Sequence, residues 1–143
     1  MTDEQLTKIR WLGRAFHARH RAAAWIAKYE RDKSIAERLS RACGGIGSTP
    51  GSGNATESCI LRLLETKERM LAEMARQQSI EAEIEAAIDT IDDPDMHAIP
   101  VRHYLAGQTF EAIAEQMHYD ERTIRRKHKA ALDRIVLECP AEM

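Results

Sequence analysis

Residues 109–132 read TFEAIAEQMHYDERTIRRKHKAAL, and this stretch decides the fold of the C-terminal part of the chain. Thr109 and Asp120 are residue types that accept hydrogen bonds from backbone N–H groups at helix N-termini. They predict a short helix over residues 110–117 and a second helix from Glu121 to Val136. The turn His118-Tyr-Asp120 joins the two. Apolar side chains recur at three- and four-residue steps in both segments, so each helix has one face for packing.

The spacing of the apolar residues predicts how the two helices pack. Two helices that cross near a right angle need a small residue where their backbones approach, and Ala114 meets that need. Ile124, ten residues later, fills the interface from the second helix. We therefore predict a helix-turn-helix unit whose structure depends on Thr109, Phe110, Ile113, Ala114, Met117, Asp120 and Ile124.

The outward face of the second helix is rich in basic residues. A helix fits the major groove of DNA, and its N-terminal residues meet the base edges, where arginine can bond guanine in two places. Lysine and arginine farther along, at Lys127, Lys129 and Arg134, are expected to contact phosphates. A solvated basic face is the alternative, but the two caps, the small residue and the short turn favour DNA. The predicted DNA-binding residues are Glu121, Arg122, Thr123, Arg125, Arg126, Lys127, Lys129 and Arg134.

Residues 92–132 resemble the region-four domain of bacterial sigma factors. They resemble more closely the tails of small phage-encoded late-transcription regulators of the ArpU and RinA type. The resemblance implies a regulator and not a complete sigma factor, because the regions with which a sigma factor opens promoter DNA are missing. The matching positions are Tyr104, Leu105, Gly107, Thr109, Phe110, Ile113, Ala114, Tyr119, Asp120, Thr123, Ile124, Ala131 and Leu132.

Three residues depart from the pattern of these regulators. Pro100 lies inside a helix predicted over residues 94–105, and it predicts a kink or an early end, because proline lacks the N–H donor and clashes with the preceding turn. His118 replaces a glycine at a turn position where the backbone often takes a positive φ. Lys127 stands where an apolar residue often packs, which weakens its assignment to a phosphate.

Two long helices are predicted upstream, over residues 3–42 with Asp3 as N-cap and over residues 57–91 with Thr56 as N-cap. Residues 43–56 hold five of the seven glycines, together with Pro50, so no helix should persist there. The apolar stripe of the first helix is expected at Leu6, Ile9, Leu12 or Gly13, Phe16, Ala23, Ile26 or Ala27, and Ile35. That of the second is expected at Ile60, Leu63 or Leu64, Met70 or Leu71, Met74, Ile84, Ile88 and Ile91.

These patterns predict an all-α protein, in which a long, coiled-coil-like helical hairpin precedes a small C-terminal helix-turn-helix domain. The hairpin is assigned to residues 1–91 and the DNA-binding domain to residues 92–143, with Asp93 capping a helix that starts at Pro94.

The charges of the long helices favour their pairing. Residues 1–42 hold ten Lys and Arg against five Asp and Glu, whereas residues 57–95 hold four against eleven. Opposite charges attract the two helices, within one chain or between two. The long helices are therefore expected to form a homodimer or to contact RNA polymerase.

Several classes of function are not expected. The three cysteines, with His17 and His20, match no metal-ligand spacing, so free thiols in a reducing cytosol are the simplest interpretation. No apolar run approaches the roughly 20 residues that a membrane helix needs. No nucleophile, base or cofactor motif can be placed. We expect a cytoplasmic protein that is not an enzyme and that needs no metal or cofactor.

The sequence thus predicts a sequence-specific DNA-binding transcription regulator of phage or prophage origin. One alternative is a phage DNA-packaging component of the small-terminase kind, which also joins a helix-turn-helix to oligomerising helices. The other is a protein-interaction module in which the basic helix binds an acidic partner, RNA polymerase included.

Overall fold

The computed structural model describes residues 2–43 and 50–137, and every regular element within them is helical. The prediction of an all-α fold is confirmed. The chain forms two compact units: Met1–His17 together with Gln78–Met143, and Ala18–Gln77. The predicted domain boundary at residue 91 does not coincide with this division, because the N-terminal helix and residues 78–91 pack with the C-terminal helices.

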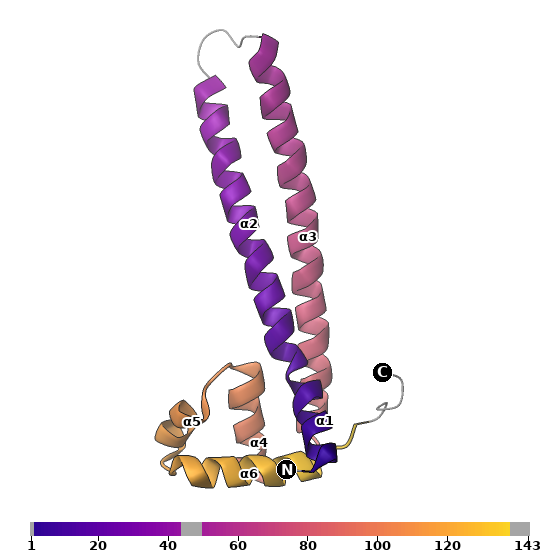
Figure 1. Cartoon of the computed structure of the whole chain (residues 1–143), viewed down its shortest axis with the longest axis vertical. Helices are drawn as coiled ribbons and strands as arrows, with labels where there is room; N and C mark the ends of the chain where they lie inside the picture. The colour runs from indigo at the N-terminus through magenta and orange to yellow at the C-terminus, as the bar shows by residue number, and fades with distance from the viewer. Residues whose placement is uncertain (1, 44–49, 138–143) are drawn as a thin grey trace. The chain divides into compact units, whose positions relative to one another are not determined.

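The unit of residues 18–77 is an antiparallel hairpin of α2 (Arg14–Cys43) and α3 (Pro50–Ile88), as Figure 1 shows. Helix α3 begins at Pro50, seven residues before the predicted start, so Thr56 lies inside the helix and is not its cap. Proline is favoured in the first turn of a helix, and the glycines that follow weaken a helix without forbidding it. Of the predicted glycine-rich loop, residues 44–49 lie outside the described part of the chain.

The predicted first helix is divided at Gly13 into α1 (Asp3–Leu12) and α2. The N-cap of α1 is Thr2 and not Asp3, because Thr2 and Gln5 form a capping box in which each side chain bonds the other's backbone N–H at 3.2 Å. At this division the helix axis changes direction, so that α1 is not collinear with the start of α2 (Figure 1).

The inner faces of the hairpin follow a strict four-then-three repeat, the spacing of a coiled-coil seam. The residues at these positions are buried or half-buried, whereas Ala23, Ala27, Ile60 and Leu64 of the predicted stripes are exposed. The inner positions are Ala18, Ala22, Trp25, Tyr29, Asp32, Ala36 and Leu39 in α2, and Cys59, Leu63, Thr66, Met70, Glu73 and Gln77 in α3.

Two polar contacts occupy the middle of this seam. Asp32, 7% exposed, accepts hydrogen bonds from the Lys28 ammonium at 2.9 Å and from the Thr66 hydroxyl at 2.8 Å. The Glu73 carboxylate, 6% exposed, accepts hydrogen bonds from Nη2 and Nε of Arg21, at 2.9 and 3.2 Å. These bonds hold the pKa of both carboxyl groups below its ordinary range. Buried polar pairs of this kind fix the register of a seam more than they stabilise it.

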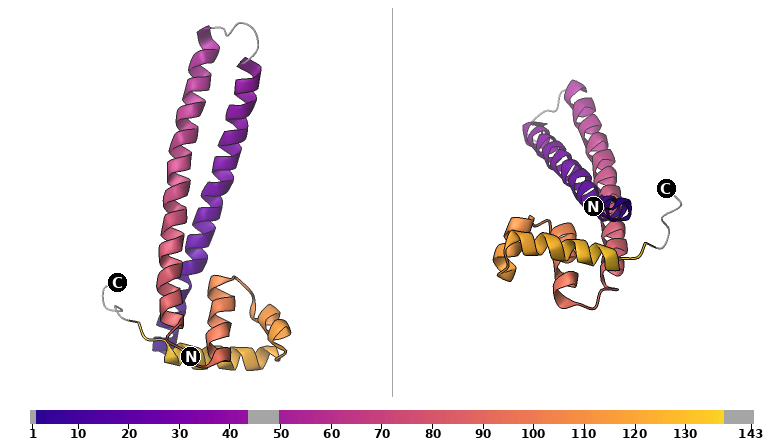
Figure 2. Two further views of the ribbon diagram at one scale, coloured as in Figure 1. Left: turned by 180° about the vertical axis from the view of Figure 1, so that it is seen from behind. Right: turned by 60° about the horizontal axis from the view of Figure 1, so that its bottom comes forward.

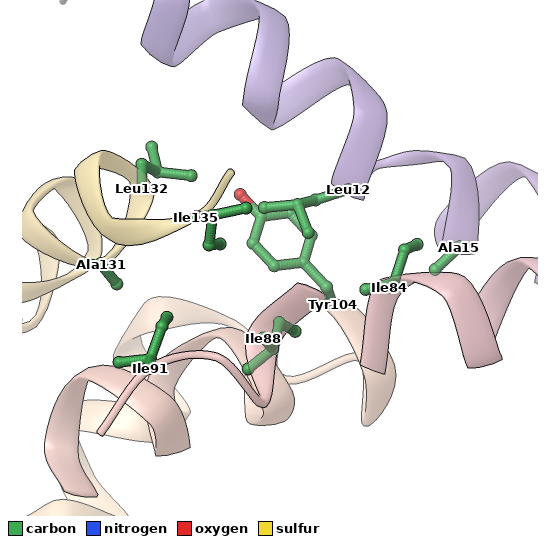
Figure 3. Close-up of a cluster of buried hydrophobic side chains, with 9 residues drawn as sticks. All are labelled: Leu12, Ala15, Ile84, Ile88, Ile91, Tyr104, Ala131, Leu132 and Ile135. Carbon is green, nitrogen blue, oxygen red and sulfur yellow. The ribbon is translucent and has the colours of Figure 1, made fainter. Parts of the chain in front are cut away.

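The other unit has a hydrophobic core built around α6 (Glu121–Arg134). Figure 3 shows the Tyr104 ring lying between Leu12 and Ile88, with Ile135 beside it. The core thus joins segments from both ends of the chain, and its buried members are Leu12, Ala15, Ile84, Ile88, Ile91, Tyr104, Ala131, Leu132 and Ile135.

Pro100 changes the helix type without breaking the chain's helical path. Helix α4 (Pro94–Pro100), capped by Asp93 as predicted, leads directly into the π-helical segment η1 (Val101–Leu105). There the Ala106 N–H donates to the Val101 carbonyl, five residues back, at 3.0 Å. Because proline offers no N–H, the α-helical pattern ends at Pro100 and the wider π turn follows.

Helix α5 (Phe110–Met117) occupies the predicted position, whereas α6 starts at Glu121 as predicted but ends at Arg134, two residues before the predicted end, because Ile135 is extended. Helix α6 runs past both α4 and α5 (Figures 1 and 2). His118, between α5 and α6, takes φ 60° and ψ 40°, the left-handed conformation that glycine adopts most readily. Among the described residues, it is the one non-glycine position with a positive φ. Within the same described residues, no helix is long and apolar enough to cross a membrane.

Replacing His118 with glycine should stabilise the protein by about 1 kcal/mol, because glycine removes the steric strain of the left-handed conformation. His118→Val should destabilise it, since a branched Cβ fits this conformation worst. Urea unfolding followed by circular dichroism measures both variants. A glycine variant less stable than the wild type would contradict the assigned turn.

Candidate nucleic-acid interface

One side of α6 is fixed against the rest of its unit. Ile124, His128 and Leu132 are buried there, and Ile124 packs with Ala114 and Ile113 of α5. Thr109 and Asp120 cap α5 and α6, accepting from the N–H groups three residues on at 3.1 and 3.0 Å. Phe110 and Met117 pack against the same cluster.

The C-terminal end of α6 is held by α1. The ammonium of Lys8, 6% exposed, donates to the Leu132 carbonyl at 2.8 Å, and Gln5 donates to the Asp133 carboxylate at 2.9 Å. A cation at the C-terminus of a helix satisfies a carbonyl that the helix itself leaves free and interacts favourably with the helix dipole. Both ends of α6 are therefore anchored.

The opposite side of α6 carries the cationic cluster, which we define as Arg122, Arg125, Arg126 and Lys129. With Thr123, these residues line a shallow depression of about 370 Å³. All four cationic residues are exposed. Within the described residues, Arg122, Arg126 and Lys129 form no ion pair, although the charge of Arg122 contributes to lowering the pKa of the nearby Asp120 carboxyl. Such a surface can bind phosphates and acceptor atoms on base edges.

Arg125 is held in position more firmly than its neighbours in the cluster. Its guanidinium bonds Glu121 at 2.7 Å and lies 4.9 Å from the centre of the Phe110 ring. Glu121, predicted to contact DNA, is therefore occupied as the partner of Arg125. Thr123 bonds the capping carboxylate of Asp120, which holds the pKa of that carboxyl below its ordinary value.

Two other predicted DNA-binding residues lie apart from the cationic cluster. The Lys127 ammonium is 3.4 Å from Asp95 and 5.1 Å from the centre of the Tyr119 ring, and Tyr119 donates to the same carboxylate at 2.7 Å. Lys127 thus links α6 to α4 at the position where an apolar residue was expected. Arg134 is exposed in the last turn of α6, beyond the depression.

The sequence analysis missed a buried polar contact under the cationic cluster. His128 is 5% exposed, and its Nε2 lies 2.7 Å from the Tyr104 hydroxyl. Burial, followed by the nearby charges of His103 and Arg125, lowers the pKa of His128 to about 4. Its position, four residues after Ile124 and four before Leu132, could have indicated that it belongs to the packed face.

Among the described residues, no three His, Cys, Asp or Glu side chains gather so as to hold a metal ion. Comparison of the chain with models of protein families, with curated proteins and with solved structures finds no match.

The fold should lose stability in mild acid because His128 is neutral in the folded state. Unfolding exposes an imidazole with an ordinary pKa of 6.5, so protonation favours the unfolded chain. The contribution is complete above pH 6.5 and is lost progressively as the pH falls to about 4. The loss amounts to roughly 3 kcal/mol.

His128→Gln keeps an acceptor for Tyr104 but does not titrate, so its unfolding free energy should vary less over this pH range. His20→Gln, an exposed site in α2, is the control and should retain the wild-type pH dependence. Urea unfolding across the range gives both profiles. Equal acid sensitivity in His128→Gln and the wild type would exclude His128 as the source.

Proposed function

We propose that the protein is a sequence-specific DNA-binding transcription regulator, in which α5 and α6 act as a helix-turn-helix. It is of the phage late-transcription type that residues 92–132 resemble. The observation that carries the proposal is the two-sidedness of α6: Ile124, His128 and Leu132 are buried on one side, and the cationic cluster projects from the other. A helix presented in this way can enter a major groove.

The positions of the four cationic residues suggest that two of them contact bases and two contact phosphates. Arg122, in the first turn of α6, and Arg125, held by Glu121 and Phe110, are the base-reading candidates. An arginine whose guanidinium is already oriented loses less side-chain entropy when it bonds a guanine. Arg126 and Lys129 continue the cationic face along the groove and are assigned to phosphates. Lys127 is assigned to holding α4 against α6, and no longer to a phosphate.

The proposed regulator binds DNA as a homodimer that is joined through the long helices. Each copy then contributes one α6, so a bound site would consist of two half-sites about one helical turn of DNA apart, or multiples of that. RNA polymerase is the second partner that regulation of this type requires.

Selection of bound sequences from random duplexes tests direct readout. The wild-type chain should enrich one sequence, and Arg122→Ala or Arg125→Ala should lose the preference at one base step, at a cost of about 1–3 kcal/mol. Arg38→Ala removes an equal charge from an exposed site on α2 and should leave the enriched sequence unchanged. Enrichment that is identical in all four proteins would contradict the proposal.

The salt dependence of binding separates DNA from an acidic protein partner. With Arg126 and Lys129 of each copy on phosphates, the dimer makes four phosphate contacts, and affinity for the enriched duplex should fall about 100-fold between roughly 50 and 200 mM salt. Fluorescence anisotropy measures this fall. If the chain does not bind DNA even at low salt, the result would favour the protein-interaction module.

A further inference from the structure

In the hairpin of residues 18–77, the most deeply buried seam positions hold small or polar residues. Its buried residues, among those that the structure describes, are Ala18, Ala22, Asp32, Thr66 and Glu73. The largest fully buried side chains of the described chain, such as Tyr104 and Ile84, all belong to the other unit. The larger apolar residues of the seam are only half-buried; they are Trp25, Tyr29, Leu39, Leu63 and Met70. Since helical hairpins are stabilised chiefly by packing of an apolar face, this incomplete burial limits the stability of the hairpin on its own.

Four large aliphatic side chains of α3 lie on the side of the helix away from this seam. Ile60, Leu61, Leu64 and Leu71 are 48%, 56%, 52% and 49% exposed. Single exposed leucines are ordinary on protein surfaces, but four on one helix face form a contiguous apolar patch that marks an interaction site.

The exposed residues follow a second four-then-three repeat on α3. The positions Leu61, Leu64, Glu68, Leu71 and Ala75 are all exposed and share one face, on the side of α3 away from the inner seam. Residues 60–75 span about 24 Å of helix, so this face is a little over two heptads long. We call it the outer face of α3, made of Ile60, Leu61, Leu64, Glu68, Leu71 and Ala75.

We propose that the outer face of α3 is the surface through which two copies of this chain associate. This inference rests on the proposed homodimer and names its interface; it does not depend on DNA binding. A second copy supplies to the outer face the apolar layer that α2 does not provide. A two-fold interface brings the same surface of both copies together.

The charges of the two helices favour a second copy at this face. Between residues 57 and 76, the exposed charged residues of α3 are three acidic and four basic, and Arg69 pairs with the buried Glu73. This surface is therefore close to neutral, and two copies of it meet without strong repulsion. Between residues 18 and 42, α2 carries seven basic and three acidic residues, and two copies of that surface would repel each other. A neutral apolar face also offers no selectivity for an acidic or a basic foreign partner.

Sedimentation equilibrium of the full chain tests the interface. The wild type should have twice the 16.2 kDa mass of one chain at micromolar concentration. Leu64→Glu combined with Leu71→Glu should weaken association by about 100-fold or more, because charges would replace buried aliphatic groups. Ala23→Glu combined with Ala27→Glu adds the same charge to the exposed side of α2 and should leave the mass of the pair unchanged.

Each outcome decides a different point. A monomeric wild type would overturn both the interface and the homodimer, whereas a pair that survives the leucine variant would overturn the interface alone. A ring of many copies would also overturn the interface and would favour the packaging component. If circular dichroism shows that the glutamate variant does not fold, Leu64→Gln with Leu71→Gln replaces it and must also weaken association. Anisotropy with DNA, measured on the same samples, reports separately on the DNA-binding proposal.

Discussion

The burial of one side of α6 is the constraint on which the rest of this account depends. A helix with six basic residues between Arg122 and Arg134 would, on its own, be free to turn any face to water. Ile124, His128, Ala131 and Leu132 remove that freedom, because each is buried against other helices of its unit. Lys8 and Asp120 add a fixed end at each terminus. The cationic side is outward as a consequence of this packing.

The same packing explains why the unit draws on both ends of the sequence. Helices α5 and α6 contribute only Ile113, Ala114 and Ile124 to a small core, which Ile99 of α4 completes. Contributions from Leu12 of α1 and from Ile84 and Ile88 of α3 extend it into a second cluster around Tyr104 (Figure 3). Small domains bury too little apolar surface to be robust, so the added helices contribute stability that residues 92–143 lack by themselves.

Local signals in the sequence were sufficient for α5 and α6. Thr109, Asp93 and Asp120 are caps that act within three residues, and His118 was recognised as a position of positive φ. The contacts of Lys8 with Leu132 and of Lys127 with Asp95 could not be predicted, because they join residues distant in the sequence. The hairpin seam was misassigned for another reason. Its inner positions include Asp32, Thr66 and Glu73, and a search for apolar periodicity passes over such residues. The pattern therefore left Leu63 and Met70, which lie in the seam, as alternatives to the exposed Leu64 and Leu71.

The central claim is that the outward side of α6 is the surface that meets DNA. Nuclear magnetic resonance of the full chain, titrated with the duplex that it selects, tests this claim most directly. The account predicts that the largest changes in backbone amide shifts fall between Glu121 and Lys129. The side-chain signals of Arg122, Arg125 and Arg126 should shift as well. Shift changes confined to residues 18–77, or none at saturating DNA, would contradict it.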